Sequence, residues 1–141
     1  MTFSVDLSSE FGVRAVDRLE AQTVAWLTTV STDGTPQPNP VWYLWNDGWF
    51  LIFSQPNQAK LKNIARHPRA SLNLEAVDGD HVTVFTGAAE LIDRAAVDQE
   101  LLDRYAARYA QGMAGIKMTR AEYEATYTAV IRFTPEKLRG W

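Results

Sequence analysis

Cysteine is absent from this chain of 141 residues. Disulfide frameworks and thiolate metal sites are therefore excluded, and a chain of this length can bury a core that does not need them. The two histidines, His67 and His81, lack the spacing of zinc ligands, so we expect no metal site. The lack of cysteine also favours the cytoplasm as the place where the protein works.

Long apolar stretches are missing as well, because nowhere do about 18 uncharged apolar residues follow one another. The first residues do not show the charged start and apolar run of a signal peptide. We therefore expect neither secretion nor contact with a membrane. The composition, 46% hydrophobic and 22% charged, is ordinary for a globular protein and predicts a single domain over residues 1–141.

Several catalytic motifs cannot be found. A GxSxG elbow, a GxGxxG loop and a Walker A loop are all lacking, so the sequence supports neither covalent hydrolysis nor a Rossmann or P-loop nucleotide site. No side chain can be named as a catalytic acid or base. If the protein is an enzyme, we expect a bound cofactor to supply the reactive group.

Positive charge is scarce overall but concentrated in one place. The net charge of −3 argues against nucleic acid as a partner, because a surface for phosphate backbones usually makes a domain basic. One short segment nevertheless carries five basic residues and no acid: Lys60, Lys62, Arg66, His67 and Arg69. A local cationic patch on an acidic protein indicates a small anionic ligand.

The pattern of apolar residues and turns predicts a mainly β protein. Strands are separated by turn signals such as Asp33-Gly34 and Asp47-Gly48, and they do not alternate with helices as βαβ units would. A mainly antiparallel barrel with inserted helices is the natural architecture. The six predicted strands cover residues 23–30, 37–44, 49–54, 70–75, 82–92 and 129–133. The predicted helices begin after caps at Ser9, Asn57, Asp93 and Thr119.

The second strand carries prolines at positions 36, 38 and 40. Proline has no N–H group, so one edge of this strand cannot pair normally along its first half. That edge either lies against a flat ligand or is an ordinary edge strand protected against aggregation.

The start of the helix after Asn57 is a candidate phosphate site. Lys60 would lie in its first turn, where the positive end of the helix dipole disfavours a lysine by a few tenths of a kcal/mol unless an anion is present. Helix amides, the Ser54 hydroxyl and the Lys60 ammonium could together hold a phosphate, with Gln55 beside them. The alternative is that Lys60 is an ordinary surface lysine. The five tryptophans likewise either wall an aromatic cofactor or pack a core and a subunit interface.

These pieces, in this order, resemble a known superfamily. The segments concerned are residues 25–30, 33–36, 40–43, 47–48, 59–64 and 67–72. They are similar to the pyridoxamine 5′-phosphate oxidase-like split-barrel superfamily, and most of all to its branch of flavin/deazaflavin oxidoreductases that use coenzyme F420. The likeness runs from Val24 to Phe133.

The resemblance implies a six-stranded antiparallel split β-barrel of the FMN-binding type, forming a homodimer with two cofactor sites between the protomers. In such proteins the second strand lies along the cofactor ring, while the end of the third strand and a lysine hold the phosphate. The partner protomer would add residues from the last strand and the tail. Carried over, the cofactor-binding residues are Gln37, Asn39, Val41, Ser54, Gln55, Lys60, Asn63, Arg132 and Trp141.

The chain also departs from part of this pattern. FMN-using oxidases place an arginine on the second strand to grip the phosphate, whereas Asn39-Pro40 stands at about that point here. F420 therefore fits better than FMN. The resemblance implies an oxidoreductase that passes a hydride between reduced F420 and a small conjugated acceptor. The alternatives are an FMN-dependent, pyridoxamine phosphate oxidase-like enzyme and a non-catalytic protein that binds flavin or F420.

Overall fold

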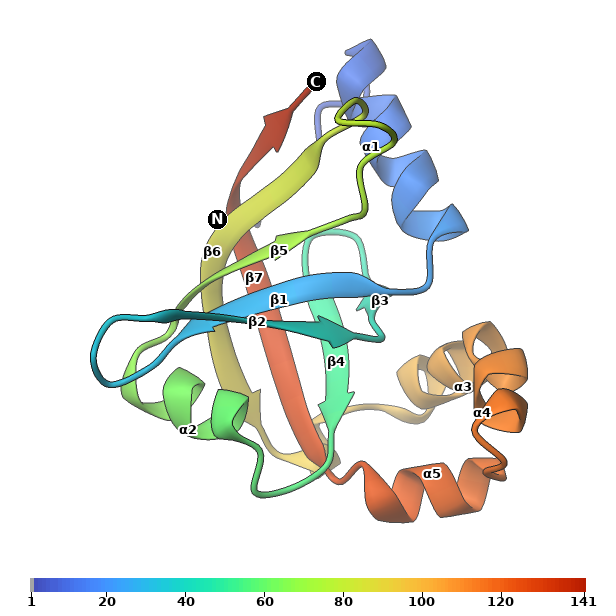
Figure 1. Ribbon diagram of the computed structural model, residues 1–141. Coiled ribbons are helices and arrows are strands. Elements are labelled where there is room, and N and C mark those ends of the chain that lie inside the picture. Colours follow the sequence, from blue (N-terminus) through green and yellow to red (C-terminus); the bar gives the residue numbers. More distant parts are fainter. Residues whose placement is uncertain (1) are drawn as a thin grey trace.

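A computed structural model describes residues 2–141. Its central feature is a single antiparallel sheet in the order β2-β1-β5-β6-β7-β4-β3, which curves around a core (Figure 1). The strands are β1 Ala25–Val30, β2 Pro36–Val41, β3 Leu44–Trp45, β4 Phe50–Ser54, β5 Arg69–Asn73, β6 Thr83–Ile92 and β7 Ala129–Gly140. The helices are α1 Glu10–Ala21, α2 Ala59–Arg66, η1 Arg94–Ala96, α3 Gln99–Arg108, α4 Ala110–Gly115 and α5 Arg120–Thr126. The predicted mainly β split barrel is confirmed, with seven strands in place of six.

The inside of the barrel is filled by alternate residues of the strands. Ala25 and Leu27 of β1, Leu72 of β5 and Phe85 of β6 are fully buried, and the register places Leu27 opposite Leu72 and Leu72 opposite Phe85. Neighbouring strand residues point to opposite faces, so the intervening side chains of these strands lie on the outside and are only partly buried. The barrel therefore has one apolar interior, and the outer face of these strands remains partly accessible.

The predicted second strand is interrupted. β2 ends at Val41, and a short β3 follows at Leu44 and Trp45, pairing with β4. The break occurs where the Tyr43 backbone binds a side chain instead of a strand: its N–H donates to the Tyr109 hydroxyl at 2.8 Å. A residue 66 positions away decides this break, which local sequence does not reveal.

The last strand is longer than predicted and runs through Pro135 to Gly140. β4 pairs with β7 only as far as Phe133, so beyond that residue β7 has a partner on one side alone. A proline is tolerated in such a half-edge position. Pro135 lies opposite Gly87, where the register with β6 shifts by a bulge.

Two of the predicted helix caps are wrong. Asn57 adopts a left-handed backbone with φ of 64°, and Gln58 takes the cap position of α2 without a side-chain hydrogen bond. Asp93 caps only the short η1, while Asp98 caps α3. The caps at Ser9 and Thr119 are confirmed, the latter as a complete capping box with Glu122.

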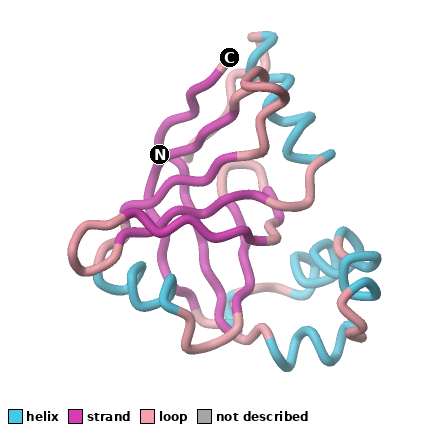
Figure 2. Tube along the Cα trace, in the orientation of Figure 1, coloured by secondary structure: helices cyan, strands magenta, loops and turns pink. Residues whose placement is uncertain are grey.

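Helices α3, α4 and α5 gather on one side of the sheet, as Figure 2 shows. They cover the outer face of β4 and β7 and form a second apolar cluster with Leu51, Phe53 and Val130. The sheet is therefore buried on both faces at β4, whose five residues are all buried. In residues 2–141 no helix has the length and apolarity needed to cross a membrane.

The C-terminal end of α1 is held by Arg108 of α3. Its guanidinium donates to the carbonyl oxygens of Leu19 at 2.9 Å and of Glu20 at 3.1 Å, and also to that of Gln22. The same guanidinium lies over the Tyr43 ring at 4.9 Å. Carbonyls that a helix end leaves without partners are thus satisfied by one cation, which ties α1, the β2–β3 break and α3 together.

Candidate functional site

A cavity of about 280 Å³ lies beside the end of β2 and the start of α2. Polar, aromatic and aliphatic side chains from five separate parts of the chain enclose it. Its lining residues are Pro40, Val41, Trp42, Phe53, Lys60, Ile116, Tyr123 and Tyr127. Figure 1 shows α2 and α5 near the same end of β4, the strand that contributes Phe53. No carboxylate lines the cavity within the described part of the chain, so its one charged group is positive.

Lys60 provides this charge. It is partly buried, and among residues 2–141 it forms no ion pair. Burial lowers the pKa of its ammonium group below that of an ordinary lysine. A half-desolvated cation with no counter-ion is an unfavourable arrangement that a bound anion would relieve.

The start of α2, where Lys60 lies, also favours the binding of an anion. α2 has no side-chain cap and no acidic residue in its first turn, whereas α1, α3 and α5 each have both. The first N–H groups of a helix need acceptors and attract negative charge. The first turn of α2 therefore offers donors and positive potential next to the cavity.

Ser54 and Gln55, at the end of β4, lie close to this cavity but are already engaged. Ser54 is only 2% exposed, and its hydroxyl donates to the Gln55 carbonyl at 2.8 Å. The Gln55 side chain is exposed and donates to the hydroxyl of Tyr127 at 3.5 Å. Gln55 thus reaches a residue of the cavity wall, while Ser54 faces its own backbone.

Asn63 of α2 is buried and holds the helix to the sheet. Its amide donates to the Thr29 hydroxyl at 3.0 Å, and its oxygen accepts from Arg66 at 3.0 Å. These bonds occupy both ends of the side chain, so in this structure Asn63 supports the position of α2.

The predicted residues of β2 lie along the open edge of the sheet. Gln37 and Asn39 pair with Thr29 and Leu27 of β1, and Val41 reaches the cavity. The Ser31 N–H donates to the Thr35 carbonyl at 3.0 Å, so these two residues form a hydrogen-bonded pair, and hydrogen-bonded and non-hydrogen-bonded pairs alternate along the hairpin from there. The three prolines fall in non-hydrogen-bonded pairs, so their backbone groups point away from β1. At these positions the open edge therefore offers carbonyl acceptors and no N–H groups.

Arg132 and Trp141 lie away from Lys60 within one chain. The Arg132 guanidinium stacks over the Trp49 ring at 4.3 Å, on the outer face of β7. Trp141 is 60% exposed and its N–H donates to the Val82 carbonyl at 3.2 Å. In Figure 1 the C-terminus is near α1, at the opposite end of the sheet from α2. The structure of one chain does not bring these two residues to the cavity.

Sequence reasoning counted Trp42 among the tryptophans that could wall a cofactor site, but it missed Tyr123 and Tyr127 of the cavity wall. Trp42 stacks on Tyr123 with ring centroids 5.5 Å apart and planes 13° from parallel, and Tyr123 stacks on Tyr127 at 4.2 Å and 14°. Trp42 also stacks on Tyr109 at 4.7 Å and 5°. The spacing of four between Tyr123 and Tyr127 was the available signal, since residues four apart share one face of a helix.

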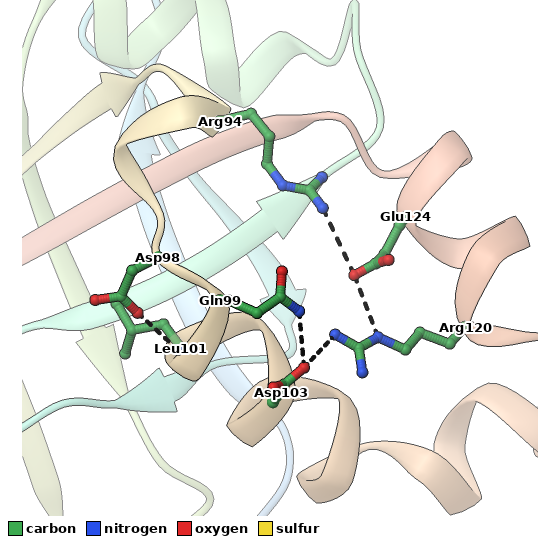
Figure 3. A network of polar contacts seen from close by, with 7 residues as sticks. All are labelled: Arg94, Asp98, Gln99, Leu101, Asp103, Arg120 and Glu124. Atoms are coloured by element: carbon green, nitrogen blue, oxygen red, sulfur yellow. Dashed lines mark hydrogen bonds and ion pairs between the residues drawn. The ribbon is translucent and has the colours of Figure 1, made fainter.

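A polar network fixes the helix that carries these tyrosines (Figure 3). Arg120 of α5 pairs with Asp103 of α3 at 2.7 Å, and Glu124 pairs with Arg94 at 3.6 Å. Gln99 also donates to Asp103 at 2.9 Å. Exposed ion pairs add little stability, yet several in one network define how α5 sits on α3 and hence where Tyr123 and Tyr127 point.

The architecture and the site together define a class of proteins: antiparallel split barrels with an anion-attracting helix start beside an aromatic cavity. The family model described as pyridoxamine 5′-phosphate oxidase matches residues 13–141. The chain therefore belongs to the pyridoxamine 5′-phosphate oxidase family, and the resemblance seen in the sequence is confirmed.

Solved structures show the same fold at low sequence identity. An F420 reductase is 20% identical, with 87% of this chain and 94% of that chain covered and a TM-score of 0.65. A FAD-binding protein from Mesorhizobium loti is 20% identical, with 89% and 90% covered and a TM-score of 0.68. A conserved hypothetical protein from Mycobacterium tuberculosis is 22% identical, with 100% and 89% covered and a TM-score of 0.68. At these identities the likeness establishes the fold.

Proposed function

We propose that the protein is an oxidoreductase that binds the deazaflavin cofactor F420 and uses it to reduce a small conjugated acceptor. The observation that carries the proposal is Lys60, a lysine without an ion pair at a helix start without a side-chain cap, on the wall of an aromatic cavity. Membership of an oxidase family and the likeness to an F420 reductase support it.

The residues present fit the phosphate of such a cofactor. A phosphate needs several donors and positive potential, which the first turn of α2 and the Lys60 ammonium offer together. Arg66 adds positive charge at the end of the same helix, and α2 contains no acidic residue. Asn39 stands where FMN oxidases have an arginine, so the phosphate would depend on α2 more than on β2.

The ring of the cofactor would lie along the open edge of β2, ending at Val41. A flat ring needs a surface that no further strand covers, and the prolines of β2 keep that edge unpaired. The cavity of about 280 Å³ is at the lower limit of ordinary ligand sites, which span about 300–1,000 Å³. It would hold the acceptor, with the cofactor outside it on the strand edge.

A second copy of the chain would complete the site as a homodimer. The centre of the outer face of β1, β5 and β6 carries no charge and is only partly buried in one chain; its two cross-strand rows are Trp26, Asn73 and Val84, and Thr28, Ser71 and Thr86. The charged residues of this face, Arg69 and Glu90, lie at its margin. An uncharged centre that bears a tryptophan, with charge at the rim, has the composition of a subunit contact. In such a dimer Arg132 and Trp141 of one protomer could approach the cofactor of the other.

Reduced F420, when bound, supplies a hydride. The chain itself would hold the phosphate at α2, orient the ring along β2 and keep water from the acceptor with the wall of Trp42, Tyr123 and Tyr127. These residues would contribute to the reaction by positioning the cofactor and the acceptor.

Flavin is the second candidate, favoured by the structural likeness to a FAD-binding protein and by the family to which the chain belongs. The same helix start would bind the phosphate of FMN. A non-catalytic carrier would show the same binding without oxidation of the cofactor by any acceptor.

A titration separates these functions. F420 and FMN would be added separately to the purified protein, with cofactor fluorescence as the readout. We expect tighter binding of F420, and a loss of about tenfold in Lys60→Gln, the size of one charge-assisted hydrogen bond. Lys62→Gln is the matched control, because Lys62 is exposed and does not line the cavity. Preference for FMN would favour the flavin function, and binding of neither cofactor would overturn both.

A further inference from the structure

The hydroxyl groups of the five tyrosines are used in different ways. Tyr43 donates to the Leu19 and Gln22 carbonyls at 2.9 and 2.8 Å. Tyr109 accepts from the Tyr43 N–H and donates to backbone carbonyls at 2.7 and 2.8 Å. Tyr105 and Tyr123 bond to each other at 2.8 Å in the interior. These four hydroxyls are therefore committed to the fold.

Tyr127 is different. Its one hydrogen bond within residues 2–141 is accepted from the Gln55 amide at 3.5 Å, at the outer limit of a hydrogen bond. A hydroxyl that accepts this bond keeps its own O–H free to donate. The residue is only partly buried and lines the cavity of about 280 Å³.

The surroundings of Tyr127 restrict what could accept that hydrogen. Its ring is fixed by stacking on Tyr123, and Tyr123 is fixed by Trp42 and by the hydroxyl of Tyr105. The rest of the wall consists of apolar and aromatic side chains, and Lys60 is on the α2 side. A planar ring system would stack in this space, and a neutral oxygen on its edge could bond to Tyr127.

We propose that Tyr127 selects the acceptor, by donating a hydrogen bond to a carbonyl oxygen on a planar fused-ring ligand bound in this cavity. The inference rests on the proposed function in one respect, namely that the ligand of this cavity is the acceptor. Lys60 serves the cofactor phosphate and Tyr127 serves the acceptor oxygen, so the two ends of the site have separate tasks. Ligands of the same shape without an acceptor oxygen would bind less well.

The test uses two soluble bicyclic probes and no cofactor. Coumarin carries a carbonyl oxygen, whereas indole is a planar bicycle with a donor and no such acceptor. Ligand-observed NMR titrations would give their affinities for the full chain and for two variants, Tyr127→Phe and Thr126→Val. Thr126 is the matched control because it belongs to the same helix and also loses a hydroxyl, which donates to the Glu122 carbonyl, and it does not line the cavity.

We expect Tyr127→Phe to weaken coumarin about three- to tenfold, the range of one neutral hydrogen bond, and to leave indole within twofold. Thr126→Val should change neither affinity beyond twofold. Equal weakening of both probes by Tyr127→Phe would show that the ring and not the hydroxyl matters, and would overturn the proposal. So would an unchanged affinity for coumarin, or no binding of either probe to the unaltered protein.

The F420 titration distinguishes failure of this inference from failure of the proposed function. Tyr127→Phe is expected to leave F420 affinity within twofold, because the cofactor phosphate is assigned to α2. If F420 does not bind but coumarin affinity depends on the Tyr127 hydroxyl, the hydrogen-bond donor site is supported and the assignment of F420 as cofactor is rejected. If F420 binding depends on Lys60 but coumarin affinity does not change in Tyr127→Phe, the cofactor assignment is supported and the role of Tyr127 in selecting the acceptor is rejected.

Discussion

The hydroxyl oxygens of Tyr105 and Tyr123 lie 2.8 Å apart in the interior of the second apolar cluster, joining α3 to α5. Burial raises the pKa of Tyr123 to about 12 and that of Tyr105 well above its ordinary value. Both groups are therefore neutral at physiological pH, and the pair is an uncharged hydrogen bond.

Removing one member of this pair should destabilise the protein more than removing both. Tyr105→Phe leaves the Tyr123 hydroxyl buried without its partner, which costs about 1–3 kcal/mol, whereas the double Phe variant leaves no unpaired group and should approach the stability of the unaltered protein. Urea unfolding of both single variants and the double variant would give the three free energies. Additive losses would contradict this expectation.

Replacement of Gly87 by any residue with a side chain is expected to destabilise the protein. A Cβ atom built there would lie 2.2 Å from the Thr134 carbonyl oxygen, in the bulge between β6 and β7. Gly87→Ala should therefore lower the free energy of unfolding by about 1–3 kcal/mol, because backbone must move. Gly115→Ala, where no atom lies within 4 Å of the added carbon, is the control and should stay within about 0.5 kcal/mol. Thermal or urea unfolding measures both, and equal effects would mean that the bulge is adaptable.

Anion binding at Lys60 should depend on pH in a defined direction. Its ammonium binds anions only while protonated, and burial lowers the pKa, so affinity should begin to fall at a lower pH than it would for an exposed lysine. Sulfate is a suitable probe because its charge stays constant across this range. The difference in sulfate affinity between the protein and Lys60→Gln, measured by calorimetry, should shrink as pH rises. A difference independent of pH would exclude Lys60 as the titrating contact.

The outer face of β1 should control assembly. Trp26 lies on that face, opposite Asn73 and Pro40 on the neighbouring strands. Trp26→Glu places a charge in the proposed contact and should convert a dimer into monomers in sedimentation experiments, with little effect on folding because the side chain is outside the barrel core. Asp17→Lys, at an exposed position of α1, is the control and should leave assembly unchanged. A monomer before mutation would contradict the proposed homodimer.

Local patterns predicted the parts of the fold that depend on near neighbours. The capping box at Thr119, the cap at Ser9 and the turns at Gly34 and Gly48 all rest on residues a few positions apart, and they appear as predicted. The end of β2 could not be predicted in this way, because a hydrogen bond from Tyr43 to the distant Tyr109 sets it.

The candidate site was predictable only in part for the same reason. Lys60 was placed in the site from its position at a helix start and Val41 from the resemblance, and both line one cavity. The tyrosines of its aromatic wall come with α5, more than sixty residues after Lys60, and no local pattern connects that helix with α2. Whether Arg132 and Trp141 reach a cofactor depends on a second chain and stays a prediction.

The position of β7 in the sheet has a consequence for synthesis of the protein on the ribosome. β7 is the last element of the chain, yet it lies between β6 and β4 and is the only partner of β4 besides the two-residue β3 among the described strands. A nascent chain that has emerged as far as α5 therefore holds β4 with its apolar residues unpaired, and the sheet cannot be completed until β7 has left the exit tunnel. Folding of the barrel should accordingly wait for β7, and a truncation within β7 would leave β4 exposed to aggregation.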